Sequence, residues 1–154
     1  MSLLRHPEEL SRLTVQPALW KSGVEELIRY VSPEQKTTRV ATSDVEFGGR
    51  RIRAGDVVML LLGAAYRDPE VFPAPDRLII DRSPNPHLAF GMGIHFCAGA
   101  GLARLEASVA PQALATLPHV HLVQESLSWQ ADTNTRALES LVLKFDPMPP
   151  TTIG

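Results

Sequence analysis

The chain has 154 residues, enough for one ordinary domain around a single core, which excludes a large multidomain protein. Hydrophobic residues make up 44% and charged residues 21%, the balance of a soluble globular protein rather than a disordered or fibrous one. The formal net charge of -2 provides no basic field for a phosphate backbone, so we expect no binding to nucleic acid.

The N-terminal residues do not resemble a secretory leader, because Pro7 and several charges precede any apolar run. The most apolar stretch, residues 57–65, is far shorter than the roughly 20 residues that a membrane-spanning helix needs. We therefore expect a cytoplasmic protein without a membrane contact. Cys97 is the only cysteine, which excludes an internal disulfide and metal sites built from two or four cysteines.

Two helices are expected near the N-terminus, over residues 7–13 and 17–31. Pro7 and Pro17 precede helix-forming runs, where the fixed φ of proline favours a helix start and its missing N–H is harmless. In the second helix apolar residues recur close to i, i+3 and i+4, which predicts that one face packs in the core. From Thr37 the period changes to two with β-branched residues, which predicts a small antiparallel sheet.

Residues 68–87 are rich in proline and show no period, so we expect an ordered surface meander. Phe72 and Leu78 indicate that this meander packs against the rest of the molecule. After Cys97 the composition is helical, and residues 138–145 alternate again, which predicts a long helix followed by a terminal β-hairpin.

The stretch around the single thiol is the most informative. Gly91, Gly93 and Gly99 allow the backbone to fold back on the Cys97 sulfur, and the helix predicted to start at the cysteine points its positive end toward it. Donated N–H groups and a helix N-terminus favour the thiolate that a soft metal or an electrophile requires. The alternative from these residues alone is a small buried cysteine in a glycine-rich turn.

This stretch resembles, position for position, the cysteine-ligand loop of the cytochrome P450 haem-thiolate monooxygenases. The resemblance implies that Cys97 is the proximal axial ligand of the iron of haem b (iron protoporphyrin IX), where a thiolate pushes electron density toward bound dioxygen. It further implies that Phe90, Gly91 and Gly99 contribute to the cofactor site. The matching positions are Phe90, Gly91, Gly93, His95, Cys97, Gly99, Leu102, Ala103, Arg104 and Glu106.

A second match lies on the helix expected at residues 17–31. Glu26 and Arg29 are three residues apart, so they share a face and can pair, and a solvated surface pair is one reading of them. The resemblance implies instead a buried pair, joined by an arginine from the meander in a structural network that holds the cysteine loop. Arg77 matches that third position, with Leu78 where the family more often has phenylalanine.

The resemblance also implies where the two haem propionates bind. Buried carboxylates need cationic or hydrogen-bonding partners, because an unpaired buried charge is costly. His95, two residues before the ligand, and Arg39, on the first expected strand, match family positions that contact the propionates. For Arg39 alone, a solvated strand arginine is the equal alternative.

Other kinds of site have weaker support. A zinc site needs about four ligands, whereas the histidines are scattered and only His95 is near Cys97. A nucleophile–base pair of Cys97 and His95 lacks an orienting acid and a nucleophile elbow. A small α+β binding module with a structural cysteine would leave the glycine-rich loop and the meander unexplained.

The resemblance implies an α+β, mainly α fold, the C-terminal part of the cytochrome P450 fold: helices, small antiparallel sheet, meander, cysteine-ligand loop, long helix and terminal β-hairpin. Residues 1–154 then form the C-terminal haem-ligand portion of one P450 domain. The N-terminal majority of that domain and its central oxygen-activating helix have no counterpart here, so we expect the isolated chain to be inactive. The alternative is a non-catalytic truncated remnant or a partner-binding module of the same family.

The implied partners are a small organic substrate, a ferredoxin-type electron donor and the missing N-terminal portion. Two segments of this chain are expected to reach the substrate. They are residues 31–38, after the second helix, and residues 134–135, at the tip of the terminal hairpin.

Overall fold

The computed structural model describes residues 1–123 and 127–147. More of the described residues lie in helices than in strands, and the strands are short, which confirms the α+β, mainly α class. The helices are α1 (Pro7–Val15), α2 (Trp20–Val31), α3 (Leu62–Ala65) and α4 (Ala100–Ala115). The strands are β1 (Thr37–Val40), β2 (Val45–Phe47), β3 (Arg50–Ile52), β4 (Val57–Leu60), β5 (His121–Leu122) and β6 (Leu143–Lys144).

Proline begins both N-terminal helices, as the sequence predicts. Pro7 is the first residue of α1, and Pro17 opens a 3-10 turn (Pro17–Leu19) that runs directly into α2. The helix α2 ends at Val31 and is capped by Ser32, which has a left-handed φ of 48° and precedes a proline that disfavours further helix.

The strands form three separate two-stranded antiparallel sheets, so the one small sheet expected between residues 37 and 60 is divided into two, and the third is the terminal hairpin. β1 pairs with β4, with Arg39 opposite Val58. β2 and β3 form a hairpin whose turn residues, Gly48 and Gly49, have φ values of 56° and 72°. Two successive positive φ angles match the twist of the flanking strands, and glycine adopts them without strain.

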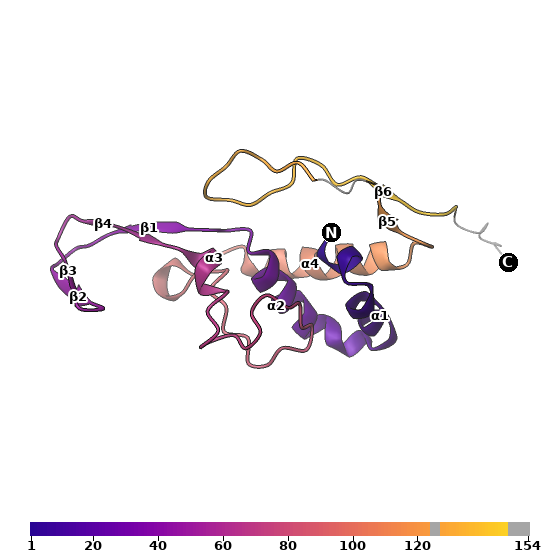
Figure 1. Cartoon of the computed structure of the whole chain (residues 1–154), viewed down its shortest axis with the longest axis horizontal. Coiled ribbons are helices and arrows are strands. Elements are labelled where there is room, and N and C mark those ends of the chain that lie inside the picture. The colour runs from indigo at the N-terminus through magenta and orange to yellow at the C-terminus, as the bar shows by residue number, and fades with distance from the viewer. Residues whose placement is uncertain (124–126, 148–154) are drawn as a thin grey trace.

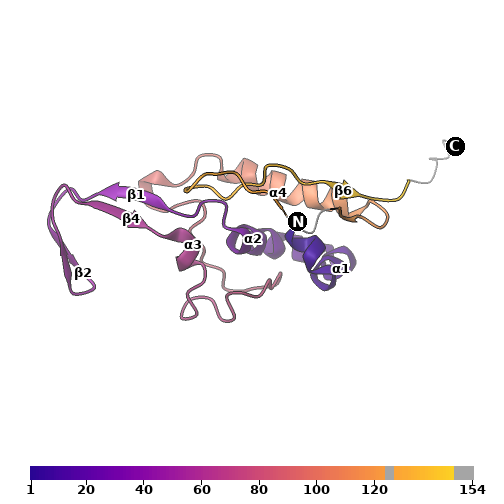
Figure 2. The same ribbon diagram turned by 45° about the horizontal axis from the view of Figure 1, so that its top comes forward.

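The C-terminal segment folds back on itself as the expected hairpin. β5 pairs with β6, and Trp129 forms an isolated antiparallel bridge with Leu138. In Figures 1 and 2 this segment runs alongside α4, which itself packs against α2.

The core lies between the N-terminal helices and the meander (residues 68–87). Phe72, Leu78 and Ile80 of the meander are buried, which confirms that this irregular segment packs. The expected apolar face of α2 is only partly covered, since Leu27 and Ile28 border the core without being fully buried. The core cluster comprises Leu3, Leu13, Trp20, Val24, Leu78 and Ile80.

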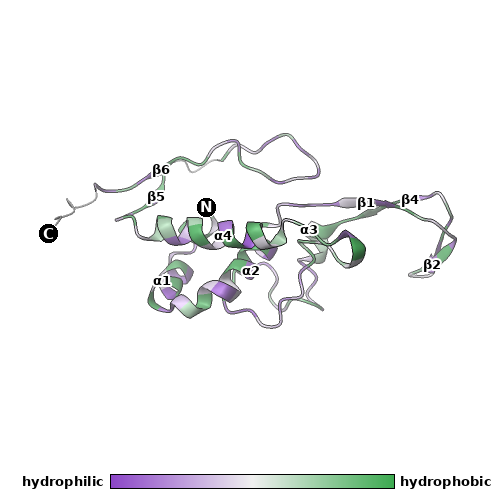
Figure 3. Ribbon diagram, turned by 180° about the vertical axis from the view of Figure 1, so that it is seen from behind, coloured by the Kyte–Doolittle hydropathy of each residue, from purple (hydrophilic) through white to green (hydrophobic). Residues whose placement is uncertain are grey.

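The β1–β4 pair leaves the helices as an arm that carries β2 and β3 at its far end (Figure 1). Figure 3 shows apolar stretches on α4 and along β4. Several of these apolar side chains are exposed to solvent, and exposed large apolar side chains in such numbers usually mark a face that another polypeptide or a ligand covers. They include Val57, Met59, Leu102, Leu105 and Val109.

Candidate functional site

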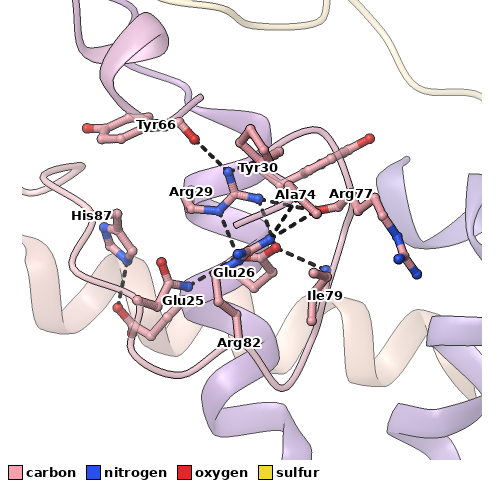
Figure 4. A network of polar contacts seen from close by, with 12 residues as sticks. Glu25, Glu26, Arg29, Tyr30, Tyr66, Ala74, Arg77, Ile79, Arg82 and His87 are labelled. Carbon is pink, nitrogen blue, oxygen red and sulfur yellow. Dashed lines mark hydrogen bonds and ion pairs between the residues drawn. The ribbon is translucent and has the colours of Figure 1, made fainter. Parts of the chain in front are cut away.

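A buried ion pair lies on the face of α2 that the meander covers (Figure 4). The side chains of Glu26 and Arg29 have no exposed surface. Arg29 Nε donates to Glu26 Oε2 at 2.8 Å, and Nη2 donates to Oε1 at 2.9 Å. A spacing of three residues on a helix therefore produces a bidentate pair shielded from water, not a solvated surface pair.

Arg82, and not Arg77, supplies the second arginine of this network. Arg82 Nε donates to Glu26 Oε2 at 3.0 Å from an almost fully buried position. The structure thus differs from the prediction that the Arg77 side chain completes the triad, because that side chain is exposed and points away from Glu26 (Figure 4). The turn closed by the Arg77 N–H on the Ala74 carbonyl leaves the carbonyl oxygen of Arg77, instead of its side chain, facing the network.

The Glu26 carboxylate accepts five hydrogen bonds in all. Besides the two arginines, the backbone N–H of Ile79 donates at 3.0 Å and Asn85 Nδ2 donates at 3.2 Å. A buried carboxylate is tolerated only when charges and donors replace its lost water, and this set does so. Glu26 therefore joins α2 to the second half of the meander.

Arginine side chains, instead of a strand ladder, hold the meander in place. Prolines remove N–H donors from the segment, so its carbonyl oxygens need partners from elsewhere. Arg29, Arg67 and Arg82 supply planar groups with several donors each, at N···O distances of 2.7–3.4 Å. The accepting carbonyls belong to Tyr66, just before the meander, and to Pro73, Ala74, Pro75 and Arg77 within it.

Cys97 is exposed in the segment between the meander and α4, which we call the cysteine loop (residues 88–99). The N–H of Cys97 donates to the carbonyl oxygen of Phe90 at 2.8 Å and so closes the loop. Gly91 has a left-handed φ of 73°, and a Cβ added there would lie 3.2 Å from the carbonyl oxygen of His95. Glycine is thus required at this position by both conformation and space.

The helix α4 begins at Ala100, three residues after Cys97, and not at the cysteine as the sequence predicts. The backbone N–H of Cys97 already binds Phe90, and the Ala100 N–H closes a turn on the Cys97 carbonyl at 3.2 Å. Cys97 therefore belongs to the loop, with Gly99 as the N-cap of the helix. A Cβ at Gly99 would lie 3.8 Å from Cys97 Sγ.

The cysteine loop itself brings together five of the predicted cofactor residues, Phe90, Gly91, His95, Cys97 and Gly99. Arg39 lies apart from them on β1, where it is exposed and donates to Thr37 Oγ1 at 3.0 Å and to the Thr38 carbonyl at 2.8 Å. Within the described residues no hydrogen bond or ion pair joins Arg39 to the cysteine loop.

A second polar cluster, which the sequence does not predict, joins α2, the meander and α4. Glu25 Oε1 accepts from Arg104 Nε at 2.7 Å, and Glu25 Oε2 accepts from Arg104 Nη2 and from His87 Nε2, both at 3.0 Å. The only hint in the sequence is that Glu25, a second acid, directly precedes Glu26. Neighbouring residues on a helix point in different directions, so Glu25 could have been expected to contact partners other than those of Glu26.

Burial, hydrogen bonds and neighbouring charges together set the protonation of this cluster. It lowers the pKa of His87, with a smaller contribution from the Arg104 charge, and it outweighs the opposing effect of Glu25 and Glu26. Burial raises the pKa of Glu25, but the hydrogen bond and charge of Arg104, together with those of His87, hold this pKa below its usual value. His87 is therefore neutral near pH 7 and donates its Nε2–H to an ionised Glu25, beside the rings of Tyr66 and Phe90.

The chain is expected to lose stability as the pH falls below the ordinary histidine pKa of about 6.5. Between that value and the lower pKa of folded His87, the unfolded state binds more protons, so the free energy of unfolding decreases with decreasing pH. Glu25 adds to the loss in the same direction below the ordinary glutamate pKa of about 4.3. Urea unfolding between about pH 7.5 and about pH 5 measures the slope.

His87→Gln removes the titrating ring and is expected to flatten this slope above about pH 5. His121→Gln, at an exposed position of β5, is the matched control and should leave the slope unchanged. A slope that is the same in wild type and His87→Gln would contradict the assignment.

The segment after α2 pairs with the tip of the C-terminal hairpin. Glu34 and Thr135 form an antiparallel bridge, which brings together the two segments expected to reach the substrate, residues 31–38 and 134–135. A polar hollow of about 350 Å³ lies beside this bridge. Its lining consists of Gln35, Trp129, Gln130, Asp132, Thr135 and Arg136.

Over residues 1–123 and 127–147, no group of three or more His, Cys, Asp or Glu side chains is placed to hold a metal ion. In the same part of the chain, none of the helices has the length and apolar character needed to span a membrane.

Residues 18–116 match the family model of cytochrome P450, which covers more than half of the chain. The chain belongs to the cytochrome P450 family. The resemblance carried by the cysteine loop and by the Glu26–Arg29 pair is thereby confirmed at the level of the family.

Relatives and solved structures agree with this membership. The biotin biosynthesis cytochrome P450 of Bacillus subtilis (strain 168) is 47% identical over 147 residues, which cover 95% of this chain and 37% of that protein. The 6-deoxyerythronolide B hydroxylase of Saccharopolyspora erythraea is 39% identical, with coverages of 94% and 36%. This chain thus spans little more than a third of the length of these relatives.

Among solved structures, P450BioI in complex with an acyl carrier protein ligated with hexadec-9Z-enoic acid has a TM-score of 0.89 and 47% identity. The match covers 94% of this chain and 38% of that chain. CalO2 also has a TM-score of 0.89, with 44% identity and coverages of 95% and 37%. Both similarities confirm that this fold is a portion of the P450 fold.

Proposed function

We propose that this chain is the haem-binding portion of a cytochrome P450 monooxygenase and that Cys97 is the thiolate ligand of the iron of haem b. The observation that carries the proposal is the cysteine loop, which exposes the only thiol of the chain in a turn shaped by glycines. A soft thiolate is a suitable axial ligand for haem iron. Membership in the P450 family supports the same assignment.

The residues around Cys97 fit a flat apolar cofactor. Phe96 in the loop, and Leu102 and Leu105 on the helix that follows, are exposed by 53%, 62% and 59%. Such side chains gain stability when a large apolar ring system removes them from water. Gly99 leaves the space beside Cys97 Sγ without a side chain.

When bound, the haem supplies the reductive activation of dioxygen that leads to hydroxylation of a small organic substrate. The residues of this chain bind the cofactor and position it and the substrate. Cys97 holds the iron, the network around Glu26 fixes the meander behind the loop, and the bridged segments at Glu34 and Thr135 form part of the substrate wall. Electrons come from a ferredoxin-type donor.

Arg39 and His95 are proposed to bind the haem propionates. His95 lies two residues before Cys97 on the same loop, and both side chains are exposed, so a charged group can approach them. Two cationic or hydrogen-bonding side chains suit the two propionates of one haem.

Arg39→Ala is expected to weaken haem binding about ten- to a hundredfold, because a charge-assisted hydrogen bond contributes about 1.5–3 kcal/mol. The thiolate-type spectrum of the reduced carbon-monoxide complex should persist, since Cys97 is untouched. Titration with haemin gives the affinities. Arg50→Ala, at an exposed arginine of β3, is the control, and an Arg39→Ala affinity equal to that of wild type would exclude the propionate role.

Residues 1–154 are proposed to be the C-terminal haem-ligand portion of a single P450 domain. Coverage of only 36–38% of the relatives supports this assignment. The exposed apolar side chains of β4 and α4 support it as well, because the remaining portion of the domain would bury them. Monooxygenase activity is then expected to require that remaining portion.

Titration of the purified chain with haemin tests the proposed function. The expected result is saturable binding of one haem per chain and a reduced carbon-monoxide complex with the thiolate-type spectrum. With reductant, a ferredoxin system and a general hydroxylation substrate, the chain alone should form no product. A chain that binds no haem, alone or mixed with the N-terminal portion of a relative, would instead be a non-catalytic remnant or a partner-binding module.

A further inference from the structure

One carboxylate ties both ends of the cysteine loop to α2. His87 directly precedes the loop and Arg104 follows it in the second turn of α4, and both donate to Glu25, at 2.7–3.0 Å. Figure 4 shows the His87–Glu25 contact beside the Glu26 network. Glu25, a residue of α2, therefore anchors the residues that flank the cysteine loop on both sides.

The two anchors also enclose Phe90. The guanidinium carbon of Arg104 lies 4.3 Å from the centre of the Phe90 ring, and the His87 ring lies 6.2 Å from it on centre-to-centre distance. The cation–π contact depends on where Glu25 holds the guanidinium. Phe90 in turn accepts the N–H of Cys97 at 2.8 Å, so a continuous set of contacts runs from Glu25 to the backbone of the cysteine.

His87 contributes through its tautomer. Its Nε2 donates to Glu25, while its Nδ1 accepts the backbone N–H of Ala89 at 3.3 Å. Only the ring with hydrogen on Nε2 and a free lone pair on Nδ1 satisfies both contacts. Glu25 selects that tautomer and so fixes the first residues of the cysteine loop.

We propose that Glu25 is a positioning residue for Cys97, which acts through His87, Arg104 and Phe90 to hold the loop that presents the thiol. The role of Cys97 as haem ligand rests on the proposed function, but its position is measurable without haem. A merely structural ion pair between α2 and α4 would change the stability of the chain and leave the local motion of the loop unchanged.

Hydrogen exchange at the Cys97 amide tests this proposal on the full chain. Glu25→Gln is expected to accelerate exchange at least tenfold, because the hydrogen bond to Phe90 opens more often when its supports are released. The rate at which iodoacetamide alkylates Cys97, the only thiol, should also differ from that of wild type by more than twofold. Glu25→Asp, which keeps the charge, should restore part of the wild-type protection.

Asp81→Asn is the matched control, since Asp81 pairs with Arg12 at 2.7 Å on the exposed surface, and over the described residues no hydrogen bond or ion pair joins its side chain to the cysteine loop. It should leave both Cys97 readouts unchanged. Exchange and alkylation in Glu25→Gln within twofold of wild type would overturn the proposal. If Glu25→Gln does not fold, Arg104→Gln decides by the same two measurements. A chain that shows the Glu25 effect but binds no haem would overturn the proposed function alone.

Discussion

Glu26→Ala is expected to lower the free energy of unfolding by about 3–5 kcal/mol, the usual effect of removing one partner from a buried charge network. The substitution leaves the guanidinium groups of Arg29 and Arg82 buried without a counter-ion. It also removes the acceptor of the Ile79 N–H and of the Asn85 amide, so four donor groups lose a partner. Urea unfolding followed by circular dichroism measures the change.

Two further variants separate charge from shape. Glu26→Gln keeps the size of the side chain but places an amide NH₂ among donors, so it is expected to be strongly destabilising too. Asp81→Ala removes the carboxylate from the exposed ion pair of Asp81 with Arg12 and should lower the free energy of unfolding by about 1 kcal/mol or less. A Glu26→Ala midpoint no lower than that of Asp81→Ala would show that the buried network does not stabilise the fold.

Cys97→Ser is expected to abolish the thiolate-type spectrum of the reduced carbon-monoxide complex. A serine hydroxyl stays protonated and is a hard oxygen ligand, so it cannot replace a thiolate on haem iron. The fold should survive, because the side chain is exposed and the bond from residue 97 to the Phe90 carbonyl is made by the backbone. The spectrum is recorded after reconstitution with haemin and reduction.

Met92 provides the control for this experiment, since it is the other sulfur-containing residue of the cysteine loop and is 74% exposed. Met92→Leu is expected to keep the thiolate-type spectrum. An unchanged spectrum in Cys97→Ser would reject Cys97 as the ligand.

Much of the backbone was predictable because local rules determine it. The ends of α2 follow from Pro17 and from the Ser-Pro step at Ser32, and the β2–β3 turn follows from two adjacent glycines. Each of these features depends only on the φ preferences of the residues involved. The start of α4 was misplaced because the backbone of Cys97 is held by Phe90, a contact that no local rule contains.

The identity of the second network arginine was not predictable by the same reasoning. A helix or strand has a period that assigns residues to faces, but the meander has none, so nothing local distinguishes an inward Arg82 from an outward Arg77. The Glu25 cluster was missed for a related reason. It joins residues 62 and 79 positions apart in the chain, and only the packing of α2 against α4 and the meander brings them together.

The arginine-to-carbonyl bonds of the meander determine how a protease would attack this chain. A segment held only by its own turns opens alone, but here opening must strip buried guanidinium groups from several carbonyls at once. Trypsin should therefore reach the exposed Arg77 only when the whole chain unfolds. The β2–β3 hairpin, with the exposed Arg50 and Arg51, should be cleaved first, although it has regular structure and the meander does not.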